Sequence, residues 1–563
     1  MSILSDVYKY NVIRDKEPDP SSPNKKGWYY SQAGVVATPT GYVACFRRSD
    51  FHTANITDIM VAYSPDGKMW SGHHSIAHAD VWNEQEVWVA PQLTKLGDGR
   101  LVIICDFGKR TSGQDWPMLS DWQKSNRGMF NYLFWSEDDG KTWTGPVKAD
   151  DVGGEPGYIT ELDDETLIYT RTISDKTNKL WSPPQPWGNI YYKSESIHSE
   201  DGGESWKEAV TLADSPFHGD CEVGIVEYAP EKLLAVTRIG HGGGQFIQPS
   251  RFVYSNDGGK SWTNPVLSPV YGQRPIVHKL QSGKLLAVYR NSWGTPGTYA
   301  FLFSPDEKFE YQPATFLYDE SRCRLNKDFL TINTGENITS LVIFGFYPAQ
   351  SPHSKVVIEA ELKVEEADLD GCNISAGCWI RFLADRVCLA DQPETGFDIN
   401  AKEWHVYKIV RSTGIISIYV DGKFKLKASV DGLENKLVQV GNRMVKGFNF
   451  NSIENDKSSG LHTKSTTHWR RLHVFVDNEK DYDIDWQWDT SKGYPDQFKR
   501  DRIIALDIIA ATASHCGYSG FTQQKDGTIV IVDYTVGGNG KTPDPMPYIR
   551  SYVVNEEILT VTK

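Results

Sequence analysis

The sequence of 563 residues lacks several features that define other classes of protein. No run approaches the roughly 20 apolar residues of a membrane-spanning helix. Residues 1–30 are polar and charged and have no signal-peptide core, which leaves a cytoplasmic protein or a secreted or periplasmic one whose leader was removed. The formal net charge of −14 argues against nucleic acid and anionic membranes as partners, because both need a basic face.

Metal-binding and redox motifs are also missing. The eight cysteines include no Cys-x-x-Cys pair and no zinc-ligand spacing. Some stand inside apolar strand patterns, such as Cys45 and Cys105, and we expect them to be buried free thiols. No His, Cys and carboxylate cluster has ligand spacing. The sequence therefore predicts neither a metal nor a cofactor.

Helix-like apolar spacing is scarce, whereas aromatic residues and glycine-rich turns are plentiful, which favours an all-β protein. One motif recurs. Ser-x-Asp-x-Gly-x-x-Trp is complete at 136–143, 199–206 and 255–262, one residue short at 64–70, and eroded at 304–309. Its Ser and Asp can bond turn amides, its Gly suits a positive φ, and its Trp can pack on the sheet. Each copy therefore marks a hairpin turn of a repeated unit.

Strand pairs recur around these boxes, and a sixth copy begins near Tyr518. Six four-stranded sheets arranged radially form a β-propeller, with residues 7–30 closing the ring. If that segment formed a blade of its own, there would be seven blades. About 180 residues between the fifth and sixth copies lack the repeat but contain alternating strand patterns, which predict an inserted β-sandwich. We expect blades one to five in 1–320, the sandwich in 321–500, and the last blade with ring closure in 501–563.

The repeat also aligns polar residues that would face the central mouth of the propeller. The second strands are followed by Arg47, Arg48, Asp106, Arg171, Arg238, Arg290 and Asp533 with Tyr534. The inner strands start near Gln32, Glu86, Glu155, Asp220 with Glu222, Arg274 and Tyr518. An arginine at one register in four copies indicates a binding site, and salt bridges between blades are the alternative explanation.

The boxes resemble the Asp-box (bacterial neuraminidase) repeats of the sialidase superfamily, and the inserted segment resembles a laminin-G/concanavalin-like sandwich. Glu222, with Arg238 sixteen residues later, is similar to the base Glu and second triad Arg of that superfamily. Tyr518 lies in a strand similar to the one that carries the nucleophilic Tyr. Asp50 lies where the superfamily keeps its acid/base Asp. The resemblance implies that Tyr518 attacks, Glu222 takes its proton, Asp50 protonates the leaving oxygen, and arginines hold an anionic group.

Two triad arginines are missing from their usual positions. The first blade reads Tyr-Tyr-Ser-Gln-Ala at 29–33, and the stretch from Trp293 to the fifth box has no arginine either. We therefore expect an exo-acting glycoside hydrolase that removes a terminal sugar and is not a standard sialidase. The predicted catalytic residues are Asp50, Glu222 and Tyr518. The predicted substrate-binding residues are Arg47, Arg48, His52, Asp106, Arg171, Asp220, Arg238, Arg274, Arg290 and Trp293.

Two other functions fit the same residues. A propeller lyase would neutralise a uronate with arginine and remove its α-proton with a His or Tyr base, and the histidines near the predicted mouth are His52, His218 and His515. A non-catalytic lectin would bind sugar without needing Glu222 beside Tyr518. Carbohydrate is the predicted partner in all three interpretations.

Overall fold

The computed structural model describes most of the chain. The described residues are 2–15, 22–23, 25–52, 54–80, 86–109, 129–150, 152, 154–177, 190–215, 217–238, 248–291, 294–317, 319–337, 340–433, 435–443, 462–509, 515–537 and 544–560. None of the helical segments in these ranges has the length and apolar character of a membrane span.

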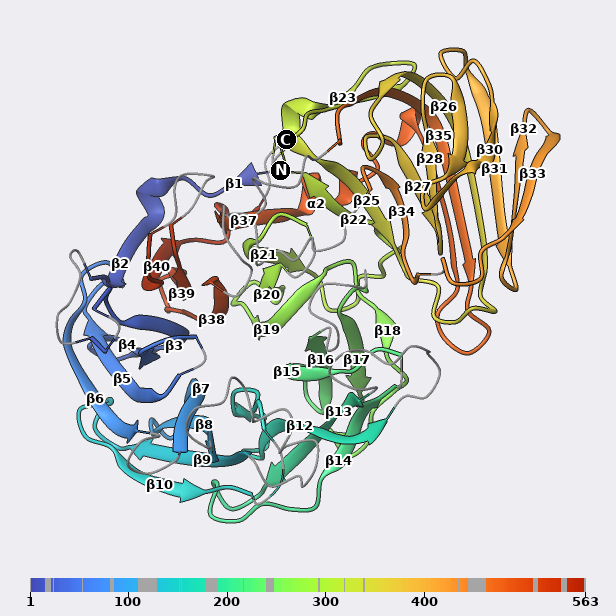
Figure 1. Cartoon of the computed structure of the whole chain (residues 1–563). Coiled ribbons are helices and arrows are strands. Elements are labelled where there is room, and N and C mark those ends of the chain that lie inside the picture. Colours follow the sequence, from blue (N-terminus) through green and yellow to red (C-terminus); the bar gives the residue numbers. More distant parts are fainter. Residues whose placement is uncertain are drawn as a thin grey trace.

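Six β-sheets stand around a common axis and form a ring, and a second β domain lies at one side of it (Figure 1). The predicted six-bladed propeller is therefore confirmed. The described part of residues 7–30 forms no seventh blade: β2 (Lys9–Ile13) pairs antiparallel with β40 (Tyr548–Val554) and closes the ring as the outer strand of blade six. The N-terminal strand thus ties the end of the chain to its beginning.

The blades have the following strands, from the axis outward. Blades one to three contain β3 (Tyr29–Thr38), β4 (Gly41–Ser49), β5 (Ile56–Ser64) and β6 (Ser71–Asp80); β7 (Glu86–Lys95), β8 (Leu101–Lys109), β9 (Met129–Ser136) and β10 (Thr144–Lys148); β11 (Thr160–Glu161), β12 (Leu167–Thr177), β13 (Ile190–Ser199) and β14 (Val210–Asp214). Blades four to six contain β15 (Cys221–Ala229), β16 (Lys232–Arg238), β17 (Arg251–Ser255) and β18 (Val266–Leu267); β19 (Gly272–Lys279), β20 (Leu285–Asn291), β21 (Gly297–Phe303), β37 (Ile503–Ile508) and β1 (Ser2–Ile3); β38 (Gly517–Gln523), β39 (Ile529–Thr535), β40 and β2.

The insertion interrupts blade five instead of separating it from blade six. Strand β21 pairs with β37, which follows the whole inserted segment, and β1 pairs in parallel with β37. Strand β22 (Ala314–Leu317) already belongs to the inserted domain. The observed limits therefore differ from the expected ones at 321 and 500, because the repeat pattern does not show that blade five takes its fourth strand from beyond the insertion.

The inserted domain consists of two sheets that share one hydrophobic core. The seven-stranded sheet contains β22, β25 (Val342–Phe346), β34 (Val438–Gly441), β27 (Asn373–Ala376), β28 (Trp379–Phe382), β29 (Arg386–Leu389) and β30 (Gln392–Asp398). The eight-stranded sheet contains β23 (Cys323–Leu325), β24 (Leu330–Thr334), β35 (Ser465–Asp477), β26 (Lys355–Ala367), β31 (His405–Ser412), β32 (Ile415–Val420) and β33 (Lys423–Ser429), with β36 (Ile484–Asp489) paired to β35. Helix α2 (Gln497–Arg502) leads back to the propeller.

The boxes form the predicted turns. In the second box, Ser136 Oγ accepts the N–H of Gly140 at 2.9 Å, and Asp138 Oδ1 accepts the N–H of Thr142 at 2.8 Å. Gly140 has a φ of +83°, and a Cβ there would press on Val43 of the preceding blade. The box therefore fixes its own hairpin and also packs against the neighbouring blade.

In five blades the inner strand contains one non-glycine residue in the left-handed region, and in blade three such a residue, Glu155, lies shortly before the inner strand β11. These residues, called the bulge residues here, are Gln32, Ala90, Glu155, Glu222, Arg274 and Tyr518, with φ between +44° and +55°. In five blades the pairing between the inner strand and the second strand shifts register at the bulge residue. In blade three, Gly154 and Gly157, on either side of Glu155, pair with β12 with the same shift. The sequence places Glu86 at this register in blade two, but the bulge lies four residues later, at Ala90.

Ala90→Gly is expected to leave the free energy of unfolding nearly unchanged, within about 0.5 kcal/mol. The relief of left-handed strain, about 1 kcal/mol or more, offsets the lost methyl group and the added freedom of the unfolded chain. Ala44→Gly is the matched control, because Ala44 is buried in β4 without a positive φ. It should cost about 1–2 kcal/mol. Thermal unfolding of both variants tests this, and equal losses would contradict the strain argument.

Candidate active site

Two sets of side chains meet at the mouth of the ring. The first set is the bulge residues. The second set lies on the second strand of each blade, opposite the residue that precedes the bulge residue. These residues, called the partner residues here, are Arg47, Asp106, Thr172, Arg238, Arg290 and Tyr534. Because the register shift between the first two strands is the same in all six blades, both sets occupy equivalent positions around the axis.

Blades four and six contribute a buried three-residue cluster. The hydroxyl of Tyr518 donates to Glu222 Oε1 at 2.8 Å. Arg238 Nη1 lies 2.6 Å from Glu222 Oε2 and donates to Tyr518 Oη at 2.8 Å. The side chains that the sequence predicts as nucleophile, base and binding arginine are therefore in direct contact across the mouth.

The charges in this cluster determine which group holds a proton. Burial alone would raise the pKa of Glu222, but Arg238, Arg274 and the hydrogen bond from Tyr518 bring it below its usual value. Burial raises the pKa of Tyr518 well above that of a free tyrosine, against the effect of Arg238. At neutral pH the phenol is protonated and the carboxylate is ionised, as required of a nucleophile that waits for its base.

Two further guanidinium groups lie over the ring of Tyr518. Arg290 is 4.1 Å from the ring centroid and Arg274 is 5.4 Å from it. Arg274 also donates to the carbonyl of Pro156 at 2.6 Å, and its Nη1 is 3.6 Å from Glu222 Oε1. The phenol is thus enclosed by positive charge, which favours any negative charge that develops on its oxygen.

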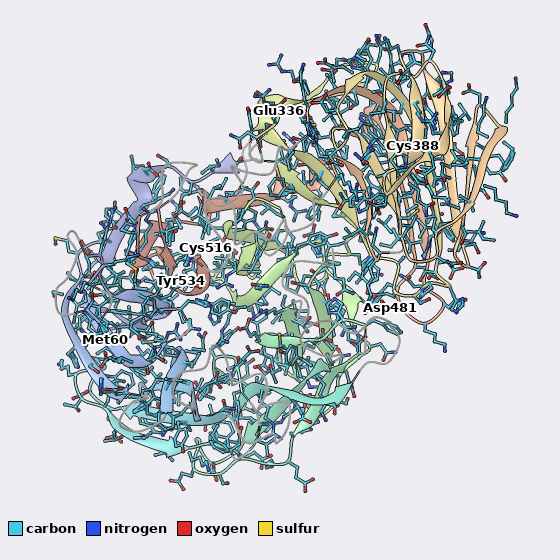
Figure 2. All side chains as sticks on the ribbon, in the orientation of Figure 1. Met60, Glu336, Cys388, Asp481, Cys516 and Tyr534 are labelled. Carbon is cyan, nitrogen blue, oxygen red and sulfur yellow. The ribbon has the colours of Figure 1, made fainter. Side chains whose placement is uncertain are left out.

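Arg290 is held by three hydrogen bonds. Its Nε donates to the carbonyl of Cys516 at 2.7 Å, its Nη1 to Gln273 Oε1 at 3.0 Å, and its Nη2 to the hydroxyl of Tyr534 at 2.6 Å. Figure 2 shows Cys516 and Tyr534 in blade six near the centre of the ring. All three of its nitrogen positions therefore have protein acceptors, which fixes the guanidinium beside Tyr518.

Glu155, the bulge residue of blade three, adds a second carboxyl group to the mouth. Its backbone N–H donates to Asp106 Oδ2 at 2.9 Å. Burial and the carboxylate of Glu222 raise the pKa of Glu155 to about 7, against the opposing effects of Arg238 and Arg274. The sequence analysis places Glu155 at an inner-strand start but does not count it among the site residues. The signal that marks it is Glu-Pro-Gly at 155–157, which matches Glu-Val-Gly at 222–224 and Tyr-Ser-Gly at 518–520.

Two histidines lie on either side of Tyr29. Its hydroxyl is 2.9 Å from His52 Nδ1 and 3.1 Å from His515 Nδ1. Burial, with Arg47 and Arg290 nearby, lowers the pKa of His52 to about 3, and burial with Arg290 lowers the pKa of His515 to about 4. Both imidazoles are therefore neutral at pH 7, and the single hydroxyl proton of Tyr29 can be donated to only one of them.

Asp50 lies in the loop after β4, and its carboxylate is bonded within that loop. Oδ1 accepts the backbone N–H groups of Phe51, Asn55 and Ile56 at 3.0, 2.8 and 3.2 Å, and Oδ2 accepts Asn55 Nδ2 at 3.2 Å. The residue is buried, with an exposed fraction of 3%. Donating a proton to a substrate would require Asp50 to give up hydrogen bonds that hold this loop together.

Arg47 and Arg48 point to opposite faces of blade one, as neighbours on a strand do. Arg47 is a partner residue, and it donates to Ser31 Oγ at 3.2 Å and to the carbonyl of His52 at 3.0 Å. Arg48 is one position out of register and forms an ion pair with Asp58 at 3.0 Å. Arg48 therefore has an acidic partner inside its own blade, and its contact with a substrate stays a prediction.

Arg171 and Asp220 are also engaged away from the Tyr518 cluster. Arg171 precedes the partner residue Thr172, so it faces the other side of β12 and pairs with Glu195 at 3.0 Å. Asp220 forms a buried ion pair with Arg251, whose Nε lies 3.0 Å from Asp220 Oδ1. The same carboxylate oxygen is 3.3 Å from Nδ1 of His218. Trp293 lies outside the described residues.

The arrangement defines a six-bladed Asp-box propeller with a tyrosine–glutamate pair at its mouth. The BNR repeat-like domain family matches residues 42–324, which is half of the chain, and the protein belongs to this family. The matched segment runs from β4 of blade one through β21 of blade five to the first strands of the inserted domain, and the family places the chain in the sialidase superfamily. No curated protein sequence matches the chain.

Several solved structures are similar in fold. A Dyadobacter fermentans protein of unknown function has 17% identity and a TM-score of 0.42, covering 61% of this chain and 95% of its own. A Hadza microbial sialidase has 17% identity and a TM-score of 0.42, with 60% and 65% covered. The sialidase of Trypanosoma rangeli has 12% identity and a TM-score of 0.38, with 85% and 97% covered.

Gly517→Ala is expected to destabilise the protein by about 2–4 kcal/mol, because Gly517 has a φ of +80° and an added Cβ would overlap Cβ of Arg290. Gly527→Ala is the matched control: its φ is +89°, but nothing lies within 4 Å of the added methyl group. Strain alone should cost it about 1 kcal/mol. Unfolding midpoints of the two variants measure the difference, and equal losses would show that the contact with Arg290 is not restrictive.

Proposed function

We propose that the protein is an exo-acting glycoside hydrolase that removes a terminal sugar, with Tyr518 as nucleophile and Glu222 as its base. The observation that carries this proposal is the 2.8 Å hydrogen bond from the Tyr518 hydroxyl to Glu222, buried at the mouth of the ring. Membership of a BNR repeat family in the sialidase superfamily supports carbohydrate as the substrate class and is compatible with either a glycan-acting enzyme or a glycan binder. Binding alone does not require a carboxylate beside a tyrosine.

The chemistry follows from the positions of the protons. Tyr518 attacks the anomeric carbon while its phenolic proton moves to Glu222, and the bond to the leaving oxygen breaks. Arg238 contacts both residues and stabilises the charge that moves between them. A second displacement by water then releases the sugar and returns the proton from Glu222 to the phenol. Two displacements retain the configuration at the anomeric carbon.

The state of the arginines supports a sugar other than a sialic acid. Two of the three arginines that would bind the carboxylate of a sialic acid are missing from their positions in the sequence. Among the described residues, Arg238 contacts Glu222 and Tyr518, while all three nitrogen positions of Arg290 have protein acceptors. These guanidinium groups support the nucleophile and its base, so we do not assign them to a substrate carboxylate.

A polysaccharide lyase is the second candidate, and the neutral histidines favour it. His52 and His515 lie on either side of Tyr29 and are unprotonated at neutral pH, as a base must be before it accepts a proton, although pKa values of about 3 and 4 make them weak bases. A lyase would cleave the glycosidic bond at a uronate by elimination, and the unsaturated product would absorb in the near ultraviolet. A hydrolase releases a reducing sugar instead, and a lectin gives neither product.

Tyr518→Phe and Glu222→Gln are each expected to lower kcat/KM by at least about 10²-fold, since each removes one partner of the nucleophile–base pair. The measurement is reducing-sugar release from a panel of terminal glycosides that includes sialosides and uronides, with ultraviolet absorbance recorded in parallel. Glu227→Gln is the matched control, because Glu227 lies on the same strand, β15, near the end opposite to Glu222. Its carboxylate accepts the backbone N–H groups of Asp163 and Glu231.

The products separate the outcomes. Reducing sugar that disappears in both site variants and persists in Glu227→Gln supports the proposal. Full activity in Tyr518→Phe would reject the nucleophile, and an unsaturated product would identify a lyase. If wild-type protein binds glycans but forms neither product, the hydrolase proposal fails in favour of a lectin.

A further inference from the structure

We propose that Glu155 is the proton donor of this reaction: it protonates the leaving oxygen and later activates the water. This inference rests on the proposed hydrolase function and names a residue for the step that Tyr518 and Glu222 leave open. Among the six bulge residues, only Glu155 and Glu222 have carboxyl groups. They belong to adjacent blades, three and four, so their carboxyl groups enter the mouth from neighbouring positions.

The backbone holds the two glutamates in fixed relation. Thr172 is the strand partner of Gly154, and its N–H donates to the Gly154 carbonyl at 2.9 Å. The hydroxyl oxygen of the same threonine accepts the N–H of Glu222 at 3.3 Å. One residue thus connects the backbone beside Glu155 to the backbone of Glu222. A proton donor needs such a rigid placement, because proton transfer requires hydrogen-bond distance to the reacting oxygen.

Arg274 provides a second connection. Its Nη2 donates to the carbonyl of Pro156, next to Glu155, at 2.6 Å, and its Nη1 is 3.6 Å from Glu222 Oε1. The carboxyl group of Glu155 itself has no hydrogen bond or ion pair with any described residue, and the residue is partly exposed. It is therefore available to a ligand, whereas the carboxylate of Asp50 accepts four hydrogen bonds within its own loop.

The protonation states suit the two roles. The ionised groups that face Glu155 are Glu222, Arg238 and Arg274. Burial raises the pKa of Asp106 well above its usual value, and Tyr192, Cys221 and Tyr518 are neutral. Burial and the Glu222 carboxylate raise the pKa of Glu155 to about 7. The arginines and Tyr518 lower that of Glu222 in spite of its burial. Two carboxyl groups with separated pKa values are the arrangement by which one site supplies both an acid and a base.

The reaction then balances in protons and bonds. In the first displacement the bond from Tyr518 Oη to the anomeric carbon forms as the glycosidic C–O bond breaks. The phenolic proton goes to Glu222, and the Glu155 proton goes to the leaving oxygen. In the second displacement the Glu155 carboxylate takes a proton from water, whose oxygen bonds to the anomeric carbon. The bond to Tyr518 breaks, and Glu222 returns its proton to the phenolate.

Leaving groups of different acidity test this assignment. The substrates are a dinitrophenyl glycoside, whose leaving group departs without a proton, and the methyl glycoside of the same sugar. Glu155→Gln is expected to lower kcat/KM about 10²–10⁴-fold on the methyl glycoside and by less than about 10-fold on the dinitrophenyl glycoside. Asp50→Asn is the matched control and should change both substrates by the same factor. Thermal unfolding checks that both variants fold.

The pH profile gives a second readout. The proton donor must hold its proton before reaction, so wild-type kcat/KM on the methyl glycoside should be full below pH 7 and fall above it, near the pKa of about 7 of Glu155. In Glu155→Gln this alkaline limb should disappear from the residual activity. A merely structural role would lower the whole profile without changing its shape.

Three results would overturn the inference. Equal losses on both substrates in Glu155→Gln would make it a structural residue, and a selective loss in Asp50→Asn would make Asp50 the donor. An alkaline limb that persists in Glu155→Gln would assign it to another group. Failure of the hydrolase proposal is distinguishable, because the wild-type protein would then release no dinitrophenol, or Tyr518→Phe and Glu222→Gln would keep full activity on the dinitrophenyl glycoside.

Discussion

The crowding of six inner strands around one axis is the constraint on which the rest of the structure depends. Two residues after the bulge, four blades have glycine: Gly34, Gly157, Gly224 and Gly520. A Cβ at each would press on the backbone of the inner strand of the next blade. In these four blades the bulge lies two residues before the close approach and changes the direction of the side chains there. Closing the ring therefore also directs one side chain per blade into the mouth.

The bulge and partner positions explain why the same fold can carry different chemistry. Their backbone geometry is the same in every blade, but their side chains are not: Ala90 is inert, Arg274 is a cation, and Glu222 is a base in contact with Tyr518. Left-handed backbone in a non-glycine residue costs about 1–3 kcal/mol and persists where the surroundings enforce it. Here the ring enforces it, so the chemistry is a matter of which residues occupy the twelve positions.

The boxes, together with the recurring strand pairs, predict the blades from sequence, because turn chemistry is local: Ser136, Asp138 and Gly140 bond within one hairpin. Contact among Glu222, Arg238 and Tyr518 is predictable from the resemblance. Arg48 and Arg171 show the limit, since each is one residue out of register and one residue reverses the face of a strand. A bulge cannot be located to one residue by apolar patterning. The glycine two residues after the bulge in four of the blades contains part of that information.

The inserted domain is connected to the strand that bears the base. Arg251 forms its buried ion pair with Asp220, two residues before Glu222, and its Nη1 donates to the hydroxyl of Tyr482 in the inserted domain at 3.1 Å. That hydroxyl donates in turn to the carbonyl of Pro265 in blade four at 2.6 Å. Figure 2 labels the adjacent Asp481 at the boundary between the two domains. A buried ion pair needs all its hydrogen bonds satisfied, because an unpaired buried charge is strongly destabilising. The sandwich therefore completes the polar network that fixes the start of β15, whatever else its surface binds.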